Sequence, residues 1–387
     1  MKIKILLLLI LAIGAGLAAS GCLPGSTCTG GGTPPRGWSG PAVANISSGD
    51  TPSEILYIGS MDGRIVAIKD IDSFGLRSWS YPDESSLTYF YGSPFVDGGV
   101  LFAAGYNGRI YALSTEGLSR MWWFPSEGNL ESIIGGPVAC NGTLYVGCSD
   151  GNLYAVNTTT GQQAWNSPFQ TGDQVWATPL ASGGTVYIGS FDHKMYAINA
   201  SDGSEVWASP FEARGAIAAT PIIYNGSLYF GALDRRFYAV DIETGEEKGG
   251  FTPYQADNWF WGKAVAYDGS IIAGSLDGNL YALDADSGNL IWSREAGGQI
   301  RGDIVLMGDT VIAGTESGRV SAFNASSGAE LWSKTLGEPP TQIRASLYGH
   351  TNSKGEDVVY VHAANQKIYA LYVESGNTKW SVSTGGQ

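Results

Sequence analysis

The stretch "SDGNLYAV" at residues 149–156 recurs almost unchanged as "LDGNLYAL" at residues 276–283. An Asp-Gly pair followed by alternating apolar residues is a strong sequence signal for a tight β-hairpin. A phrase that returns so far along the chain indicates a repeated hairpin, and further copies are therefore expected.

The alanine of this phrase has equivalents at intervals of about 43 residues. These equivalents are Ala67, Ala112, Ala155, Ala197, Ala239, Ala282, Ala322 and Ala370. A strand-like segment ending in a small residue precedes each alanine, and a Thr-Gly or Ser-Gly turn follows most of them. A further short segment, often containing proline, precedes each pair. Each unit is therefore expected to be a four-stranded antiparallel meander.

Eight such sheets have sixteen faces to bury, and no sheet can bury its own faces alone. Stacking the sheets around one axis buries them and leaves only short edges. Asn-Gly turns and strict alternation of apolar residues exclude helical repeats of similar length. The sequence predicts an all-β fold, an eight-bladed β-propeller of four-stranded antiparallel blades, over residues 38–387. We expect a monomer whose first and last blades close the ring by side-chain packing.

The N-terminal region is typical of an exported protein. Lys2 and Lys4 precede an apolar run, which predicts a signal peptide over residues 1–21. The string "ASGC" ending at Cys22 resembles a lipobox, which predicts lipidation of Cys22; an ordinary cleaved signal with an incidental cysteine is the alternative. Residues 22–37 are expected to be the lipidated cysteine and a flexible tether. This layout predicts an extracytoplasmic, membrane-anchored lipoprotein, at the outer membrane and periplasm or at the cell surface.

The net charge of the chain limits the partners that we expect, and the spacing of its cysteines limits the disulfides. The formal net charge is −14, and such a surface repels phosphate backbones, so no nucleic-acid partner is expected. The predicted turn at Asn141-Gly142 separates Cys140 from Cys148 by about five residues along the strands, beyond the reach of a disulfide. Both cysteines are therefore expected to be free.

The segments "VNTTTGQQAW" (156–165), "INASDGSEVW" (198–207) and "LDADSGNLIW" (283–292) resemble the tryptophan-docking repeat of quinoprotein-type (PQQ-like) propellers. That family includes PQQ-dependent alcohol dehydrogenases and BamB, the propeller lipoprotein of the outer-membrane β-barrel assembly machinery. The resemblance implies that one tryptophan per blade packs against the neighbouring blade: Trp165, Trp207, Trp292, Trp332 and Trp380. In blade 5 Gly249 occupies this position, which predicts lost aromatic packing and a poorly protected outer strand.

The resemblance leaves an enzyme and a scaffold to be distinguished. Quinoprotein dehydrogenases commonly hold PQQ and calcium in the axial funnel beside an adjacent pair of cysteines, and no two cysteines are adjacent here. Among the strands assigned to the axis only Asp303 offers a carboxylate, and His193, His350 and His362 lack zinc-like spacing. We therefore predict no catalysis, cofactor or metal, and a lipid-anchored protein-binding scaffold in envelope or surface-protein assembly. The alternatives are a PQQ-dependent dehydrogenase-like quinoprotein and a binder of sugars or small anionic ligands.

Alignment of the first segments of the blades predicts where a partner binds. The residues three positions before the proline position vary, whereas those one position later are all small. Small residues are expected where eight strands crowd the axis, so the variable ring should line the mouth of a funnel. Exposed aromatic and arginine side chains commonly anchor interfaces. The candidate partner-binding residues are Trp38, Tyr91, Trp176, Trp259, Phe260, Trp261, Arg301 and Arg344. Alternatively, the aromatics pack between blades and the arginines pair with carboxylates such as Asp303.

Overall fold

The computed structural model describes residues 37–48, 51–69, 71–82 and 88–385, and within these ranges the secondary structure consists of strands β1 to β32. None of the described residues belongs to a helix that is long and apolar enough to cross a membrane. The predicted signal peptide, Cys22 and nearly all of the predicted tether lie outside the described residues.

The strands form eight separate four-stranded sheets, each in chain order with antiparallel neighbours. Blade 1 contains β1 (Pro41–Ser48), β2 (Thr51–Gly59), β3 (Ile65–Lys69) and β4 (Leu76–Tyr81), and blade 2 contains β5 (Phe95–Asp97), β6 (Val100–Gly105), β7 (Arg109–Ser114) and β8 (Arg120–Phe124). Blade 3 contains β9 (Val138–Cys140), β10 (Thr143–Gly147), β11 (Asn152–Asn157) and β12 (Phe169–Gln170), and blade 4 contains β13 (Leu180–Ser182), β14 (Thr185–Gly189), β15 (Lys194–Asn199) and β16 (Phe211–Glu212).

Blades 5 to 8 repeat this arrangement. Blade 5 contains β17 (Ile222–Tyr224), β18 (Ser227–Gly231), β19 (Arg236–Asp241) and β20 (Tyr254–Gln255), and blade 6 contains β21 (Val265–Tyr267), β22 (Ser270–Gly274), β23 (Asn279–Asp284) and β24 (Leu290–Glu295). Blade 7 contains β25 (Val305–Met307), β26 (Thr310–Gly314), β27 (Arg319–Asn324) and β28 (Glu330–Thr335), and blade 8 contains β29 (Tyr348–Thr351), β30 (Asp357–Ala363), β31 (Lys367–Tyr372) and β32 (Thr378–Ser383).

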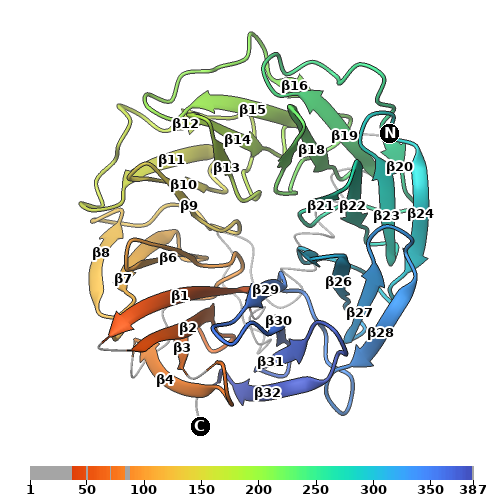
Figure 1. The fold of residues 1–387 in the computed structure, drawn as a ribbon. Coiled ribbons are helices and arrows are strands. Elements are labelled where there is room, and N and C mark those ends of the chain that lie inside the picture. Colours follow the sequence, from red (N-terminus) through yellow and green to blue (C-terminus); the bar gives the residue numbers. More distant parts are fainter. Residues whose placement is uncertain (1–36, 49–50, 70, 83–87, 386–387) are drawn as a thin grey trace, which may run out of the picture. The chain divides into compact units, whose positions relative to one another are not determined.

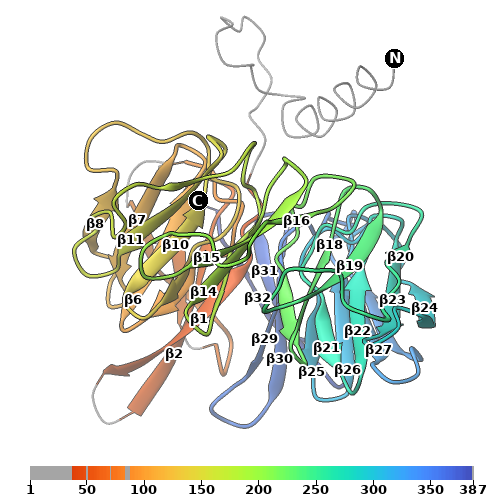
Figure 2. The ribbon, with the colours of Figure 1, turned by 90° about the horizontal axis from the view of Figure 1, so that it is seen from above.

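The sheets surround one axis, with first strands such as β1, β9, β13 and β29 near the centre and fourth strands such as β4, β24 and β32 at the periphery (Figure 1). Blade 8, in blue, lies beside blade 1, in orange. Figure 2 shows the same blades turned by 90°. This arrangement confirms the predicted eight-bladed β-propeller.

The repeated phrase forms the hairpin between the second and third strands of a blade. Asp150 accepts hydrogen bonds from the Asn152 backbone N–H at 3.0 Å and from the Tyr154 hydroxyl at 2.7 Å. Asp277 makes the same pair of bonds with Asn279 and Tyr281, each at 2.9 Å. An aspartate that accepts a backbone N–H two residues on stabilises a tight turn. The Asp and Tyr of the phrase therefore fix the turn to the strand that follows.

Adjacent blades share hydrophobic cores. One core combines Ile272 and Leu280 of blade 6 with Val311 and Phe323 of blade 7, all at most 1% exposed. Because each interface is a small core of its own, the propeller can exceed the size at which a single core stops growing.

A tryptophan contact crosses most of these interfaces. The Trp165 indole N–H donates to the Ala200 carbonyl of the next blade at 3.1 Å, and its ring centroid lies 5.7 Å from that of Tyr145. A Cβ on Gly203 would lie 2.8 Å from the same indole, so only glycine admits the ring. Equivalent bonds join Trp122 to Thr158, Trp207 to Ile242, Trp292 to Ala325, Trp332 to Val373 and Trp380 to Ile71.

Blade 5 replaces this contact with two other residues. The Lys248 ammonium donates to the Ala285 carbonyl at 2.8 Å, and the Phe251 ring lies 5.9 Å from that of Tyr229. The expectation that Gly249 removes the aromatic packing is therefore wrong, because Phe251 supplies it from two positions further along.

Outer strands are reduced in three adjacent blades rather than in blade 5 alone. β12, β16 and β20 are each two residues long. Pro168, Pro210 and Pro253 precede them, and proline lacks the N–H that would continue the ladder.

Side chains join blades 1 and 8. Their shared core includes Leu56 and Ile58 of blade 1 with Val358 and Tyr360 of blade 8, and the Trp380 indole donates to the Ile71 carbonyl at 2.8 Å. Within the described ranges the two sheets exchange no strand. The structure thus agrees with the expected closure by side-chain packing.

His362 adds a polar contact at this closure. Its Nδ1 lies 3.0 Å from the Ser39 carbonyl oxygen, and its Nε2 lies 3.3 Å from Thr384 Oγ1. A carbonyl only accepts, so Nδ1 carries the hydrogen. Burial lowers the pKa of His362 from 6.5 to about 4, so the ring remains neutral at pH 7.

Substitution of Gly328 by alanine should destabilise the propeller more than the same change at Gly308. Both glycines have positive φ, but a Cβ at 328 would lie 2.7 Å from the Trp292 ring, whereas a Cβ at 308 meets nothing within 4 Å. Left-handed backbone alone should cost about 1 kcal/mol, and displacement of the indole should raise the total for Gly328→Ala to about 3 kcal/mol. Urea unfolding of both variants measures the difference. Equal losses would contradict the close-approach explanation.

Acidification should weaken the fold through His362. Between pH 6.5 and 4 the unfolded chain binds a proton at this residue and the folded chain does not, so stability falls as the pH falls. The difference between the two pKa values corresponds to about 3 kcal/mol at pH 4 relative to pH 7. Urea unfolding at several pH values should show a smaller loss for His362→Asn than for the unchanged protein. The same pH dependence in both would contradict this assignment.

Candidate functional site

The segments that lead into the first strands enclose a cavity of about 440 Å³ on the axis, which we call the funnel. Ligand sites commonly fall in the range of about 300–1,000 Å³. All eight residues of the predicted variable ring line it: Trp38, Tyr91, Ile134, Trp176, Ala218, Trp261, Arg301 and Arg344. The alignment of the repeats thus placed the mouth of the funnel correctly.

Backbone crowding explains the ring of small residues that follows. A Cβ on Gly135 would lie 2.5 Å from the Ala177 carbonyl oxygen, and one on Gly302 would lie 2.2 Å from that of Ala345. Even a methyl group therefore does not fit at Gly135 or Gly302.

Two arginines lie between two tryptophans where blades 6, 7, 8 and 1 meet the funnel. Arg301 lies over the Trp261 ring at 5.0 Å, and Arg344 lies over the Trp38 ring at 5.8 Å. The carboxylate of Glu316 joins the two arginines, accepting from Arg301 Nε and lying 3.5 Å from Arg344 Nε. The side chains of Arg301, Arg344 and Glu316 are 20%, 35% and 14% exposed, so each retains some accessible surface.

Aromatic contacts extend this arrangement in both directions. Trp38 meets Tyr91 edge to face at 4.6 Å, and Tyr91 meets Tyr106 at 5.4 Å. On the other side, Trp176 lies 6.5 Å from Trp261. We call this series the rim: Trp176, Trp261, Arg301, Glu316, Arg344, Trp38, Tyr91 and Tyr106. The expectation that Tyr91 is exposed is wrong, because it is only 4% exposed and packs between Trp38 and Tyr106. Edge-to-face and tilted ring contacts and cation–π contacts hold the members of the rim in place before any partner arrives.

The candidate residues Phe260 and Trp259 are not part of the rim. Phe260 is 0% exposed and packs against Phe237 and Tyr281 in the core between blades 5 and 6. It occupies the position that is apolar and buried before each ring residue, as at Ile217. Its assignment as a partner-binding residue is therefore corrected. Trp259 is half-buried and is not among the residues that line the funnel.

The arginines pair with Glu316 and not with Asp303. Asp303 Oδ1 instead accepts the Lys263 backbone N–H at 2.7 Å. Glu316 lies in the turn between β26 and β27, where the corresponding residues of other blades, such as Phe191 and Leu276, are uncharged. Alignment of the turns, like that of the first segments, would have identified it.

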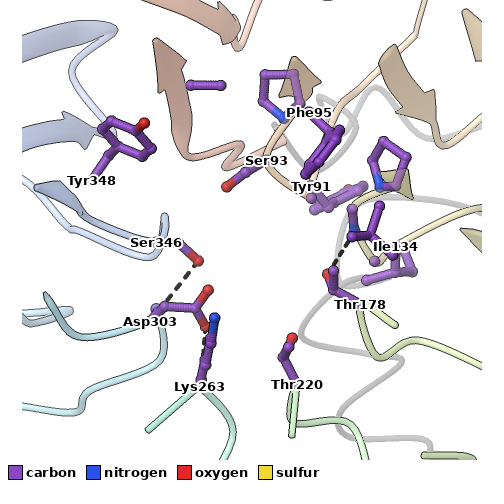
Figure 3. A pocket seen from close by; sticks show the side chains of 18 of the residues that line it. Tyr91, Ser93, Phe95, Ile134, Thr178, Thr220, Lys263, Asp303, Ser346 and Tyr348 are labelled. Carbon is purple, nitrogen blue, oxygen red and sulfur yellow. Dashed lines mark hydrogen bonds between the residues drawn. The ribbon is translucent and has the colours of Figure 1, made fainter. Parts of the chain in front are cut away.

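A second set of residues lies next to the small ring, and of its members the sequence analysis singled out only Asp303. Figure 3 shows these side chains around the open centre of the cavity. We call them the polar ring: Ser93, Thr178, Thr220, Lys263, Asp303 and Ser346. They come from blade 2 and from blades 4 to 8, two residues after the variable ring, and this spacing is the signal that could have revealed them.

Other reactive groups do not converge on the funnel. Among the described residues no three or more His, Cys, Asp or Glu side chains are grouped so as to hold a metal ion. Cys140 and Cys148 are free thiols, as predicted, and burial raises the pKa of Cys148 to about 12. His350 lies 3.0 Å from Glu54, between the extended inner hairpins of blades 8 and 1.

The fold and its axial site define an eight-bladed propeller of PQQ-like repeats with an aromatic and arginine rim. The family described as outer membrane protein assembly factor BamB matches residues 36–177, 149–248 and 255–387, and the chain belongs to that family.

Comparison with solved structures supports the fold. BamB from Moraxella catarrhalis is 18% identical with a TM-score of 0.63, covering 86% of this chain and 91% of that one. The computationally designed Ika8 protein is 15% identical with a TM-score of 0.69, covering 88% of this chain and 100% of that one. A search of curated proteins gave no match.

Proposed function

We propose that this protein is a lipid-anchored, extracytoplasmic scaffold that binds a protein partner through the rim of its funnel. The observation that carries the proposal is the continuous series of aromatic and arginine side chains from Trp176 to Tyr106. Tryptophan, tyrosine and arginine are the residue types most enriched among interface positions that dominate binding energy.

The rim is also preorganised. Arg301 and Arg344 are already held by Glu316 and by the faces of Trp261 and Trp38, so little side-chain entropy remains to be lost on binding. A single propeller presents the whole surface, which is consistent with a monomeric scaffold.

Membership of a family described as outer membrane protein assembly factor supports a role in the envelope or in surface-protein assembly. We propose that the scaffold is non-catalytic and works without a cofactor, because the rim residues are built for contact and Asp303 is engaged by backbone. The anchor is the lipid on Cys22, which follows the predicted signal peptide.

Removal of the rim charges should abolish partner capture. The triple variant Arg301→Ala, Arg344→Ala, Glu316→Gln avoids leaving an unpaired carboxylate at the rim. The partner is the protein that the unchanged propeller enriches in pull-downs from native membranes, identified by mass spectrometry. The amount of this partner captured by the triple variant should be at least tenfold lower, because buried arginine anchors commonly contribute about 2 kcal/mol or more.

The matched control is Arg294→Ala with Arg319→Ala, which removes one arginine from the outer strand β24 of blade 6 and one from the third strand β27 of blade 7. This control should capture as much partner as the unchanged protein does. The melting temperatures of both variants should lie within a few degrees of that of the unchanged protein. Undiminished capture by the rim variant would refute the proposal.

Replacement of Cys22 should release the protein from the membrane. Serine has no thiol to carry the lipid, so Cys22→Ser removes the anchor that we propose. Fractionation of cells expressing each form should move the variant to the soluble extracytoplasmic fraction, while Cys28→Ser, in the same tether, stays with the membrane. A Cys22→Ser protein that still sediments with membranes after a high-salt wash would contradict lipid anchoring.

A further inference from the structure

The polar ring offers several hydrogen-bond donors that have no acceptor among the described residues. The hydroxyl groups of Ser93 and Thr220 and the ammonium of Lys263 have no hydrogen-bond or ion-pair partner among the residues that the structure describes. Thr178 and Ser346 use their oxygens to accept from the backbone N–H groups of Gly136 at 2.8 Å and Asp303 at 3.3 Å. Each of those hydroxyls keeps its own hydrogen to donate.

One carboxylate also belongs to the polar ring. Asp303 is that carboxylate, and its Oδ1 is occupied by the Lys263 backbone N–H. Four hydroxyl hydrogens and three ammonium hydrogens remain available to a ligand. Because a hydroxyl can donate as well as accept, all of these groups can turn their hydrogens toward a ligand that only accepts hydrogen bonds.

Charge distinguishes the funnel from the rest of the protein. Lys263, Arg301 and Arg344 contribute three positive charges to the rim and polar ring, and Asp303 and Glu316 contribute two negative ones, which leaves 3 − 2 = +1. The whole chain carries −14. An anion is thus attracted to the axis and repelled elsewhere.

We propose that the polar ring binds a carboxylate carried into the funnel by a peptide segment of the partner. Lys263 supplies the compensating charge, and the hydroxyls of Thr220 and its neighbours supply hydrogen bonds. A carboxylate is planar, singly charged and acceptor-only, so it matches this donor set. Its single charge meets about half the repulsion from Asp303 and Glu316 that a phosphate dianion would meet. The neutral hydroxyls of a sugar would leave the Lys263 charge uncompensated.

This inference rests on the proposed function, because it describes what the partner inserts below the rim. The carboxylate comes either from the end of a chain or from an Asp or Glu side chain. Both sources present the same group, and the experiment separates them.

The test uses three N-acetylated tetra-alanine peptides: one with a free C-terminal carboxylate, one with a C-terminal amide, and one amidated with glutamate at its third position. Ligand-observed NMR titration of the full propeller yields each Kd. One of the two carboxylate peptides should bind at least tenfold more tightly than the plain amide, and which one does so identifies the source. Equal affinities, or no binding by any peptide, would overturn the proposal.

Lys263 variants test the assigned group. Lys263→Met should remove the preference for carboxylate, Lys263→Arg should retain it, and Lys367→Met, at an exposed lysine on β31, should leave it unchanged. A preference that survives Lys263→Met would overturn the assignment. Partner capture by the Arg301 and Arg344 variant is a separate measurement, so a failure of this inference does not resemble a failure of the proposed function.

Discussion

The contact between a tryptophan of one blade and a glycine of the next is the interaction on which the propeller depends. The indole donates to a carbonyl of the neighbouring blade, and the glycine allows the ring to lie against its backbone, as for Trp292 and Gly328. No blade can bury its own two faces, so the stability of the propeller comes from the interfaces between blades. The interface between blades 5 and 6 shows that the contact requires a hydrogen bond and an aromatic ring. There Lys248 supplies the hydrogen bond and Phe251 supplies the ring.

Stacking the blades in a closed ring also determines the site. Eight chain segments approach the axis so closely that only glycine, alanine or serine fits at one level, as the spacing of Gly302 and Ala345 shows. The residues directly before and directly after that level have space only toward the axis. One crowded layer therefore positions both the rim and the polar ring, and presents them on a rigid support.

The repeat made the fold and much of the rim predictable from the sequence. Each hairpin carries its own turn chemistry, and a residue in the same column of eight repeats occupies the same place in eight blades, as Trp38 and Arg344 do. What could not be predicted is which side chains meet across blades. Glu316 contacts the arginines of two blades. Phe260 is buried in the interface between blades 5 and 6, although its neighbours in the sequence are two candidate partner-binding residues. Such pairings depend on side-chain direction in three dimensions, which a one-dimensional period does not encode.

The central claim is that the mouth of the funnel is the binding surface. Hydrogen–deuterium exchange of the propeller, alone and in complex with the protein it captures, measures this most directly. We predict slowed exchange in residues 258–263, 299–303 and 342–346, with no change in the outer strands β24, β28 and β32. Protection confined to outer strands, with these three segments unchanged, would contradict the account.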